Sequence, residues 1–156
     1  MKKLIYSLLF VLCSIFALHA ESMVVATYNL RNANAGDSTN GNGWGQRYPY
    51  IALLVQFHGF DIFGTQEGKY NQLQDLKNVM PEYDYIGVGR DDGKHLGEHS
   101  AIFYRTAKFE VLDHGDFWLS TITDRPNKGW DAVLPRICTW GKFRDKETGF
   151  IFLFFN

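Results

Sequence analysis

The most restrictive feature of this sequence is the alternation of strand and helix patterns between residues 23 and 79. A run rich in β-branched residues, MVVATYNL at 23–30, predicts a buried strand. A predicted helix at 48–58, a short strand at 61–65 (DIFGT) and a second helix at 69–79 follow it. Alternation of this kind favours an α/β fold in which the two strands are neighbours in one sheet.

The segments around the predicted helices carry turn and loop signals. Gly59 directly follows the first helix, and glycine is the usual residue just past a helix C-terminus. Pro81 marks the end of the second helix. Between the first strand and the first helix, residues 31–46 (RNANAGDSTNGNGWGQ) are polar and dense in Asn and Gly, which predicts a long loop. Loops this long inside a compact domain are usually functional or disordered.

Beyond residue 82 the helix patterns disappear and strand patterns replace them. Five strands are predicted, at 83–88, 100–104, 109–112, 136–143 and 149–155. Residues 145–149 predict the hairpin loop between the last two. The final run, FIFLFF at 150–155, has no polar alternation, which is typical of a strand buried on both faces. Because the chain ends one residue later, we expect the fold to be cut short, with this strand left uncovered.

The N-terminus predicts a secretory signal peptide over residues 1–20. Two lysines precede a long apolar run, and Ala20 followed by Glu21 offers a cleavage point, although Leu18 stands where a small residue is usual. The run is short for a membrane span, so we expect a secreted or periplasmic protein, with an uncleaved anchor as the alternative. Residues 21–156 are long enough for one domain.

Charge and cysteine content exclude some classes of protein. Removing Lys2 and Lys3 from the 16 basic residues leaves 14 against 17 acidic ones, a net charge of −3. A strongly basic nucleic-acid binder is therefore not indicated. Cys138 would be the one remaining cysteine, so an internal disulfide is excluded, and we expect it to be a small buried strand residue. The aromatic content of 16% fits either a well-filled core or a surface that stacks on sugars or bases.

Two polar motifs follow the first two predicted strands. Asn29 lies in TYNLR and Glu67 in GTQE, each at the end of its strand. Ligands in α/β sheets gather beyond the carboxyl ends of the strands, so neighbouring strands would place both side chains in one cleft. A carboxylate beside an amide oxygen forms the hard oxygen site that Mg²⁺ prefers. As alternatives, Asn29 satisfies backbone groups at a strand end, and Glu67 is the first-turn acid of the next helix.

Taken together and in this order, the motifs resemble the opening of the endonuclease/exonuclease/phosphatase superfamily, to which deoxyribonuclease I belongs. Residues 97–105 (GEHSAIFYR) are similar to the family strand that carries a Glu before an apolar Phe–Tyr pair. Segments 117–120 (FWLS) and 129–136 resemble parts of its secreted and deadenylase-like branches. The resemblance implies a two-sheet α/β sandwich and phosphate-ester hydrolysis with Mg²⁺ or Mn²⁺, with Asn29 and Glu67 at the metal.

The resemblance extends to further candidate residues. Glu98 and Arg136 are candidate substrate-binding residues; the alternatives are a solvated loop charge for Glu98 and a structural partner of Asp131 for Arg136. We expect His99 to be an ordinary loop residue. The tryptophans are expected mostly to pack in the core or in loops, with Trp44 in its Gly-rich loop a candidate for contact with substrate.

The family's second half contains an Asn-x-His motif, a Gly-Asp-x-Asn motif and an Asp–His pair, none of which is present in full. Asn156 occupies the position where the first of these would start, and it is the third candidate substrate-binding residue. Asp116 in GDF resembles the start of the second, but Trp118 stands where Asn is required. We therefore expect Asp116 to be a turn or strand-edge residue.

The hypothesis from the sequence is a metal-dependent phosphodiesterase, nuclease or phosphatase whose residues 21–156 form the N-terminal half of the family domain, incomplete and inactive as this fragment. Nucleic acid, a phospholipid head group, an inositol phosphate or a sugar phosphate would fit as substrate, and the mildly acidic charge predicts no stable nucleic-acid complex. The missing C-terminal half is a candidate partner. The alternatives are a non-catalytic remnant and a secreted, aromatic-rich carbohydrate-binding module. The strand–helix opening argues against the module, because most such modules are nearly all β.

Overall fold

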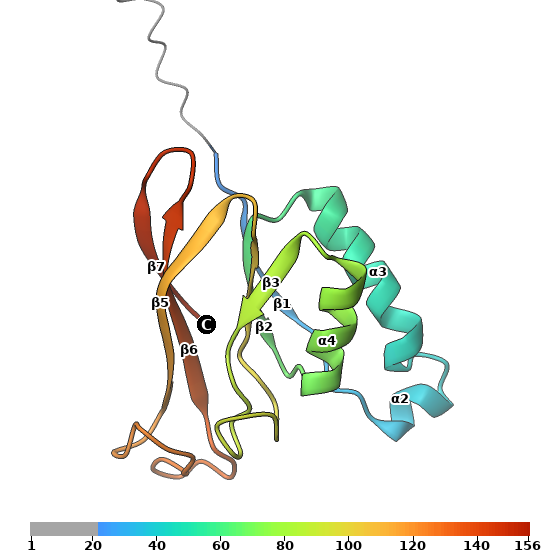
Figure 1. The fold of residues 1–156 in the computed structure, drawn as a ribbon. Coiled ribbons are helices and arrows are strands. Elements are labelled where there is room, and N and C mark those ends of the chain that lie inside the picture. The colour runs from blue at the N-terminus through green and yellow to red at the C-terminus, as the bar shows by residue number, and fades with distance from the viewer. Residues whose placement is uncertain (1–21) are drawn as a thin grey trace, which may run out of the picture.

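The structure is a computed structural model that describes residues 22–156, so the predicted signal peptide and its cleavage point lie outside the described residues. Figure 1 shows three layers side by side, a group of helices, a sheet, and a second sheet. No helix among the described residues is long and apolar enough to cross a membrane.

The first sheet has four strands in the order β1-β2-β4-β3. β1 (Val25–Asn29) and β2 (Ile62–Gln66) pair in parallel, with Asn29 opposite Gln66. β4 (Ile102–Arg105) runs antiparallel to β2 and also to β3 (Tyr83–Ile86). The predicted adjacency of the first two strands is therefore confirmed, and their carboxyl ends lie at the same edge of the sheet.

The first predicted helix begins earlier than the sequence pattern indicates. α3 spans Trp44–His58 rather than 48–58, and a short helix, α2 (Ala35–Thr39), lies inside the predicted loop. A tertiary contact fixes the first turn of α3, because the buried indole of Trp44 donates from Nε1 to Asp75 on α4 (Tyr70–Val79) at 2.8 Å. Periodicity cannot reveal such a contact, and it also makes Trp44 a core residue. α3 ends at Gly59, as predicted, with φ of 62°.

The helices cover one face of the first sheet and bury the larger core between the layers. Phe63 of β2 and Phe103 of β4 stack with ring centroids 5.2 Å apart at the centre of this core. Val55 of α3 and Leu73 of α4 are fully buried against the same face. Burial of these apolar side chains between the helices and the sheet is the main favourable contribution to folding in this part of the protein.

The second sheet is antiparallel throughout, in the order β5-β6-β7. β5 extends over Phe109–Trp118, so the predicted strand at 109–112 is too short; the pairing with β6 (Ile137–Asp145) shifts register between Val111 and Asp113 and then continues. A β-bulge of this kind interrupts the alternation of side chains that a sequence pattern depends on. Phe109 and Phe143 face the first sheet and form a second core with its isoleucines.

β7 (Ile151–Phe155) is covered on one face only in the described residues, in line with the expectation of an apolar strand that is left uncovered. Its even-numbered residues, Phe152 and Phe154, pack on the second core, whereas Ile151, Leu153 and Phe155 are exposed. The apolar run therefore places apolar side chains on both faces of the sheet, and the described part of the chain covers one of these faces. Within residues 22–156 the strand pairs with β6 alone.

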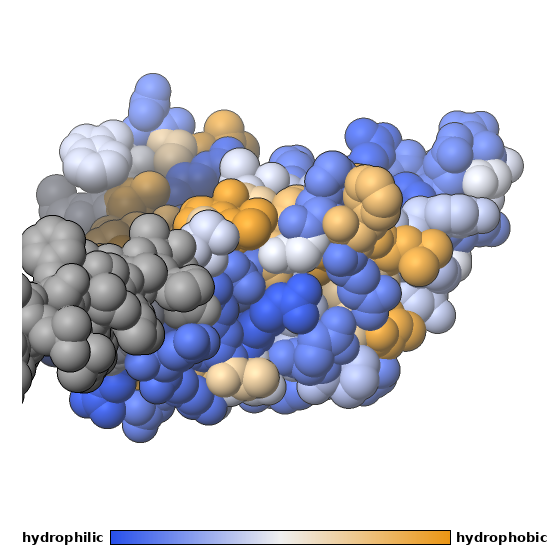
Figure 2. Space-filling model, turned by 90° about the horizontal axis from the view of Figure 1, so that it is seen from above, coloured by the Kyte–Doolittle hydropathy of each residue, from blue (hydrophilic) through white to orange (hydrophobic). Residues whose placement is uncertain are grey.

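The ends of the molecule differ in character. The connections that follow β3 and β5 gather at the lower end in Figure 1, below the carboxyl ends of β1 and β2. The upper end, seen in Figure 2, is mostly hydrophilic outside the grey atoms, with apolar side chains in separate patches. Loops that follow strand ends are the usual place for a ligand site in a sheet of this kind.

Asn156 ties the two sheets together. Its backbone pairs with Thr139 of β6, and its amide nitrogen donates to the carbonyls of Thr65 (2.8 Å) and Ala101 (3.0 Å) in the first sheet. Its amide oxygen accepts from Gln66 Nε2 at 2.7 Å. A side chain on Gly64 would collide with this amide, so the glycine leaves the room that the bridge needs.

We expect Asn156→Asp to lower the free energy of unfolding by about 1–3 kcal/mol, because a carboxylate cannot donate to the two carbonyls that it would face. The measurement is urea unfolding of the purified chain at low concentration. Asn71→Asp, on the exposed surface of α4, is the matched control and should change stability by less than about 0.5 kcal/mol. An equal, small effect of the two changes would show that the bridge contributes little.

Candidate active site

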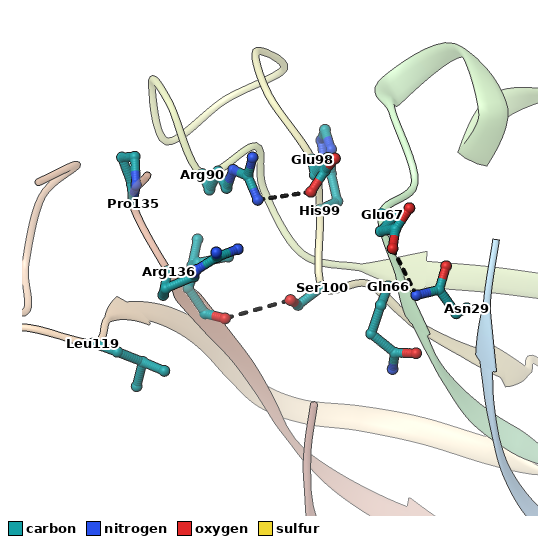
Figure 3. Close-up of a pocket in the computed structure, with 11 residues that line it drawn as sticks. Asn29, Gln66, Glu67, Arg90, Glu98, His99, Ser100, Leu119, Pro135 and Arg136 are labelled. Atoms are coloured by element: carbon teal, nitrogen blue, oxygen red, sulfur yellow. Dashed lines mark hydrogen bonds and ion pairs between the residues drawn. The ribbon is translucent and has the colours of Figure 1, made fainter. Parts of the chain in front are cut away.

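A cavity of about 300 Å³ opens at the carboxyl ends of β1 and β2, where the sequence places a cleft. Four of the five predicted site residues line it, namely Asn29, Glu67, Glu98 and Arg136 (Figure 3). The fifth, Asn156, does not line the cavity, because its pairing with β6 directs the side chain between the sheets. Its predicted contact with substrate stays a prediction.

Glu67 stands directly after β2 with φ of 61°, in the left-handed region that side chains other than glycine rarely adopt. Such a conformation costs about 1–2 kcal/mol and is concentrated at functional sites. Glu67 lies outside the first turn of α4, whose N-cap is Lys69, so the alternative role as a helix-dipole acid does not fit. Its carboxylate accepts from Asn29 Nδ2 at 2.9 Å and from the backbone N–H of Asn32 at 3.3 Å.

The Asn29 amide is held from both sides. Its oxygen accepts the backbone N–H of Arg31 at 2.7 Å, and this bond turns the amide nitrogen toward Glu67. Asn29 therefore orients the carboxylate in this structure, and it satisfies a backbone group at a strand end at the same time. The second lone pair of its oxygen is the one left for a cation. Direct metal ligation by Asn29 stays a prediction.

Asn32 is a site residue that the sequence analysis missed. In addition to its backbone bond to Glu67, its side chain donates from Nδ2 to Glu98 Oε1 at 2.9 Å. One residue of the polar 31–46 stretch thus connects the two carboxylates that line the cavity. The sequence holds no signal for this pairing, since Asn32 and Glu98 are 66 residues apart.

Arg90 is the second missed residue, and it pairs with Glu98 at 2.7 Å. The two side chains are only 12% and 21% exposed, so water screens their charges less than it screens a surface pair. The Nε of Arg90 is buried without a hydrogen bond in the described residues and lies 3.7 Å from an Asp91 carboxylate oxygen. Glu98 is thus a paired, half-buried charge and not a solvated loop residue.

Arg136 brings an exposed positive charge to the cavity. Its side chain makes no hydrogen bond or ion pair with another residue in 22–156, so the alternative pairing with Asp131 is absent from the described structure. In Figure 3 it lies between Pro135 and Leu119 on one side and Ser100 on the other. An unpaired guanidinium is a suitable ligand for phosphate oxygens, which it can bind through two N–H groups.

His99 forms part of the cavity wall and is almost fully buried, contrary to the expectation of an ordinary loop residue. Its Nδ1 lies 3.2 Å from the carbonyl of Gly68, and burial lowers the pKa of the imidazole. A neutral ring whose Nδ1–H donates to this carbonyl accounts for both observations. His99 thus fixes the loop that carries Glu98 to the loop that carries Glu67.

The donor set of the cavity fits a magnesium-type ion better than a zinc-type ion. No three His, Cys, Asp or Glu side chains in residues 22–156 come together as a metal cluster. Mg²⁺ needs no such cluster, because it is held by one or two carboxylates plus water and substrate phosphate. Glu67 retains free lone pairs beyond its two hydrogen bonds, so it can supply the carboxylate.

The fold and cavity define a class of protein, the two-sheet α/β sandwiches with a cavity of charged residues at one end. Comparison with known proteins defines the family. A scan against family models and a search of curated proteins both give no match. Among solved structures, a mannosyl-6-phosphatase of Bacteroides thetaiotaomicron is 69% identical, with a TM-score of 0.86, over 86% of this chain and 51% of that one.

Two further solved structures are described as endonuclease/exonuclease/phosphatase proteins. One, also from Bacteroides thetaiotaomicron, is 68% identical with a TM-score of 0.86, over 87% of this chain and 50% of that one. The other, from Bacteroides vulgatus, is 48% identical with a TM-score of 0.83, over 87% and 52%. The chain therefore belongs to the endonuclease/exonuclease/phosphatase family, corresponds to its N-terminal half, and spans about half the length of these relatives. The predicted family and fold class are confirmed.

We expect Arg90 and Glu98 to be strongly coupled. Arg90→Met leaves Glu98 as a half-buried charge without its cation, and we expect a loss of roughly 1–3 kcal/mol in the free energy of unfolding. Adding Glu98→Gln should restore part of this loss, giving a coupling energy above about 0.5 kcal/mol in a double-mutant cycle measured by urea unfolding.

Arg144→Met with Glu110→Gln is the matched control, because that ion pair has a similar distance of 3.0 Å but is about half exposed. Its coupling should be about 0.3–0.5 kcal/mol or less. Equal coupling in the two pairs would contradict the view that burial makes the Arg90–Glu98 pair special.

Proposed function

We propose that the protein hydrolyses a phosphate ester with the help of Mg²⁺ or Mn²⁺, and that its substrate is a mannosyl 6-phosphate or a closely related sugar phosphate. The observation that carries this proposal is Glu67, which is held in a strained backbone conformation at the cavity by Asn29 and Asn32. The choice of substrate rests on the mannosyl-6-phosphatase, which is 69% identical over the matched residues.

In this proposal the described residues bind and orient the reactants. Glu67 would hold the cation, which supplies Lewis-acid polarisation of a phosphoryl oxygen and neutralises charge in the transition state. The N–H groups of Asn29 and Asn32 keep the carboxylate in one orientation, so it does not reorganise as charge develops. Arg136 would bind non-bridging phosphate oxygens, while Arg90 and Asn32 keep Glu98 from repelling them.

We further propose that these residues are one half of the site. The relatives are about twice as long as the matched part of this chain, and no described residue at the cavity stands out as a base for the attacking water. His99 is buried and directs Nδ1 to a carbonyl. The general base would then come from a second half, equivalent to the part of the relatives that lies outside the match. That half would also pack on the exposed face of β7. The 156-residue chain alone is expected to be inactive.

The predicted signal peptide supports a location outside the cytoplasm. We propose that the protein is secreted or periplasmic. Cell fractionation with detection of the mature N-terminus tests this proposal, and a cytoplasmic protein that retains residues 1–20 would overturn it.

Glu67→Gln tests the assignment of the metal site. We define the chimera as residues 22–156 of this chain joined to the part of the Bacteroides thetaiotaomicron mannosyl-6-phosphatase that the match leaves uncovered. We expect the chimera to hydrolyse mannose 6-phosphate when Mg²⁺ or Mn²⁺ is present, and Glu67→Gln to lower kcat/KM at least about a hundredfold, because the amide keeps the shape but removes the charge.

Glu110→Gln, an exposed acid on the second sheet, is the control and should leave kcat/KM unchanged. Isothermal titration with Mn²⁺ gives an independent readout, in which Glu67→Gln should weaken binding. Full activity of Glu67→Gln would remove the metal assignment, and full activity of the 156-residue chain alone would disprove the half-site proposal.

Arg136→Met tests the assignment of the phosphate ligand. Loss of a charged hydrogen bond to phosphate should raise KM about tenfold or more, and Arg136→Lys should recover only part of the loss because lysine cannot bind through two parallel N–H groups. Steady-state kinetics of the chimera give the comparison, with Arg144→Met as an exposed control. An unchanged KM in Arg136→Met would show that Arg136 has no contact with the phosphate.

A further inference from the structure

The cavity is polar at one end and apolar at the other. Figure 3 shows Glu67 and Asn29 on one side and Leu119 and Pro135 on the opposite side, with Arg136 between them. A phosphate ester has the same polarity, since its phosphoryl group is charged and the group that it esterifies is less polar. The side with the two apolar residues is therefore the candidate position for the esterified group.

The apolar side belongs to a well-braced connection between β5 and β6, residues 119–136. Ser120 and Asn127 are hydrogen-bonded through their side chains, and Asn127 Nδ2 also donates to the carbonyls of Ile122 and Arg125, each at 2.6 Å. Gly129 is buried so close to Leu119 and Ser120 that no side chain would fit on it. Gly129 thus fixes residue 130 next to the segment that forms the cavity wall.

Trp130 has two unfavourable features, a strained backbone and an exposed aromatic side chain, and no contact in the described residues offsets them. Its φ is 49°, in the left-handed region, and its side chain is 80% exposed, which corrects the expectation of a core or loop-packing tryptophan. Its indole N–H makes no hydrogen bond within residues 22–156. Three residues other than glycine have positive φ in the described part of the chain. Of the other two, Glu67 lines the cavity and Arg31 donates its backbone N–H to the Asn29 side chain.

We propose that the 119–136 connection is the leaving-group subsite, in which Trp130 binds the apolar face of the sugar ring while Arg136 and the site around Glu67 bind its phosphate. This inference rests on the proposed function and names the part of the protein that selects the sugar. An indole offers a large, rigid, apolar face with a polar edge, which suits a pyranose ring that has C–H groups on its face and hydroxyls around its rim. Leu119 and Pro135 of the same connection line the cavity itself. Trp130 is not among the lining residues, and it follows Gly129, which packs directly against Leu119 and Ser120.

The first test measures binding to the full chain by saturation-transfer NMR, with mannose 6-phosphate and glycerol 3-phosphate as the probes. Transfer should be strongest to the ring protons of mannose 6-phosphate. It should fall several-fold in Trp130→Gly and be retained in Trp130→Phe, which keeps an aromatic face. Phe57→Ala, which removes an aromatic side chain of similar exposure from α3, is the matched control and should have no effect.

The second test uses the chimera. Trp130→Gly should lower kcat/KM for mannose 6-phosphate about tenfold, which corresponds to about 1.4 kcal/mol, and leave kcat/KM for glycerol 3-phosphate unchanged. Because glycine adopts positive φ without strain, the same variant should unfold at an equal or higher temperature. Loss of recognition without loss of stability is a result that a merely structural tryptophan would not give.

The outcomes separate this inference from the proposed function. Hydrolysis of both substrates by the unmodified chimera, with an equal effect of Trp130→Gly on the two or no effect on either, would overturn the subsite and leave the proposed function standing. A Trp130-dependent preference for adenosine 5′-monophosphate over mannose 6-phosphate would show a nucleobase subsite and overturn the sugar assignment. Failure of the unmodified chimera to hydrolyse any phosphate ester would overturn the proposed function and the subsite with it.

Discussion

The parallel pairing of β1 with β2 is the contact on which the rest of the structure depends. It requires a crossover, and α3 provides this by packing across the sheet with its C-terminus fixed at Gly59. The register places Asn29, the last residue of β1, opposite Gln66, the last residue of β2. Glu67 comes directly after Gln66, so its carboxylate lies within reach of the Asn29 amide. A shift of one residue would send these side chains to opposite faces. The pairing of Asn29 with Glu67 is thus a consequence of the register.

Much of this arrangement could be predicted from the sequence. The two motifs lie at strand ends, where backbone direction alone decides that their side chains meet, so Asn29 and Glu67 were accessible to pattern reasoning. Asn32 and Arg90 were not, because each reaches its partner across loops whose path is set by tertiary packing. The predicted start of α3 was wrong for the same reason, because the hydrogen bond from the Trp44 indole to Asp75 fixes the position of the first turn.

The apolar run of β7 shows the limit of composition as a guide to burial. A continuous apolar strand is expected in the middle of a covered sheet, and its hydrophobicity says nothing about which neighbour covers each face. In the described residues Phe152 and Phe154 fill the space between the sheets, and Asn156, the next residue after the strand, bonds across that space. One polar side chain that follows an apolar strand thus adds hydrogen bonds between two sheets that meet mainly through apolar contacts.

The charges of the cavity explain why its two carboxylates have separate roles. Glu98 has a guanidinium partner at 2.7 Å, so its charge is neutralised within the protein. Glu67 has only N–H dipoles at its oxygens, which orient the carboxylate without cancelling its charge. Arg136 has no carboxylate partner in the described residues. Its positive charge equals the negative charge of Glu67 in the same cavity, but the two side chains form no ion pair. A cation at Glu67 together with a phosphate at Arg136 would satisfy both groups at once, which is why we expect metal and substrate to bind to this cavity more tightly together than separately.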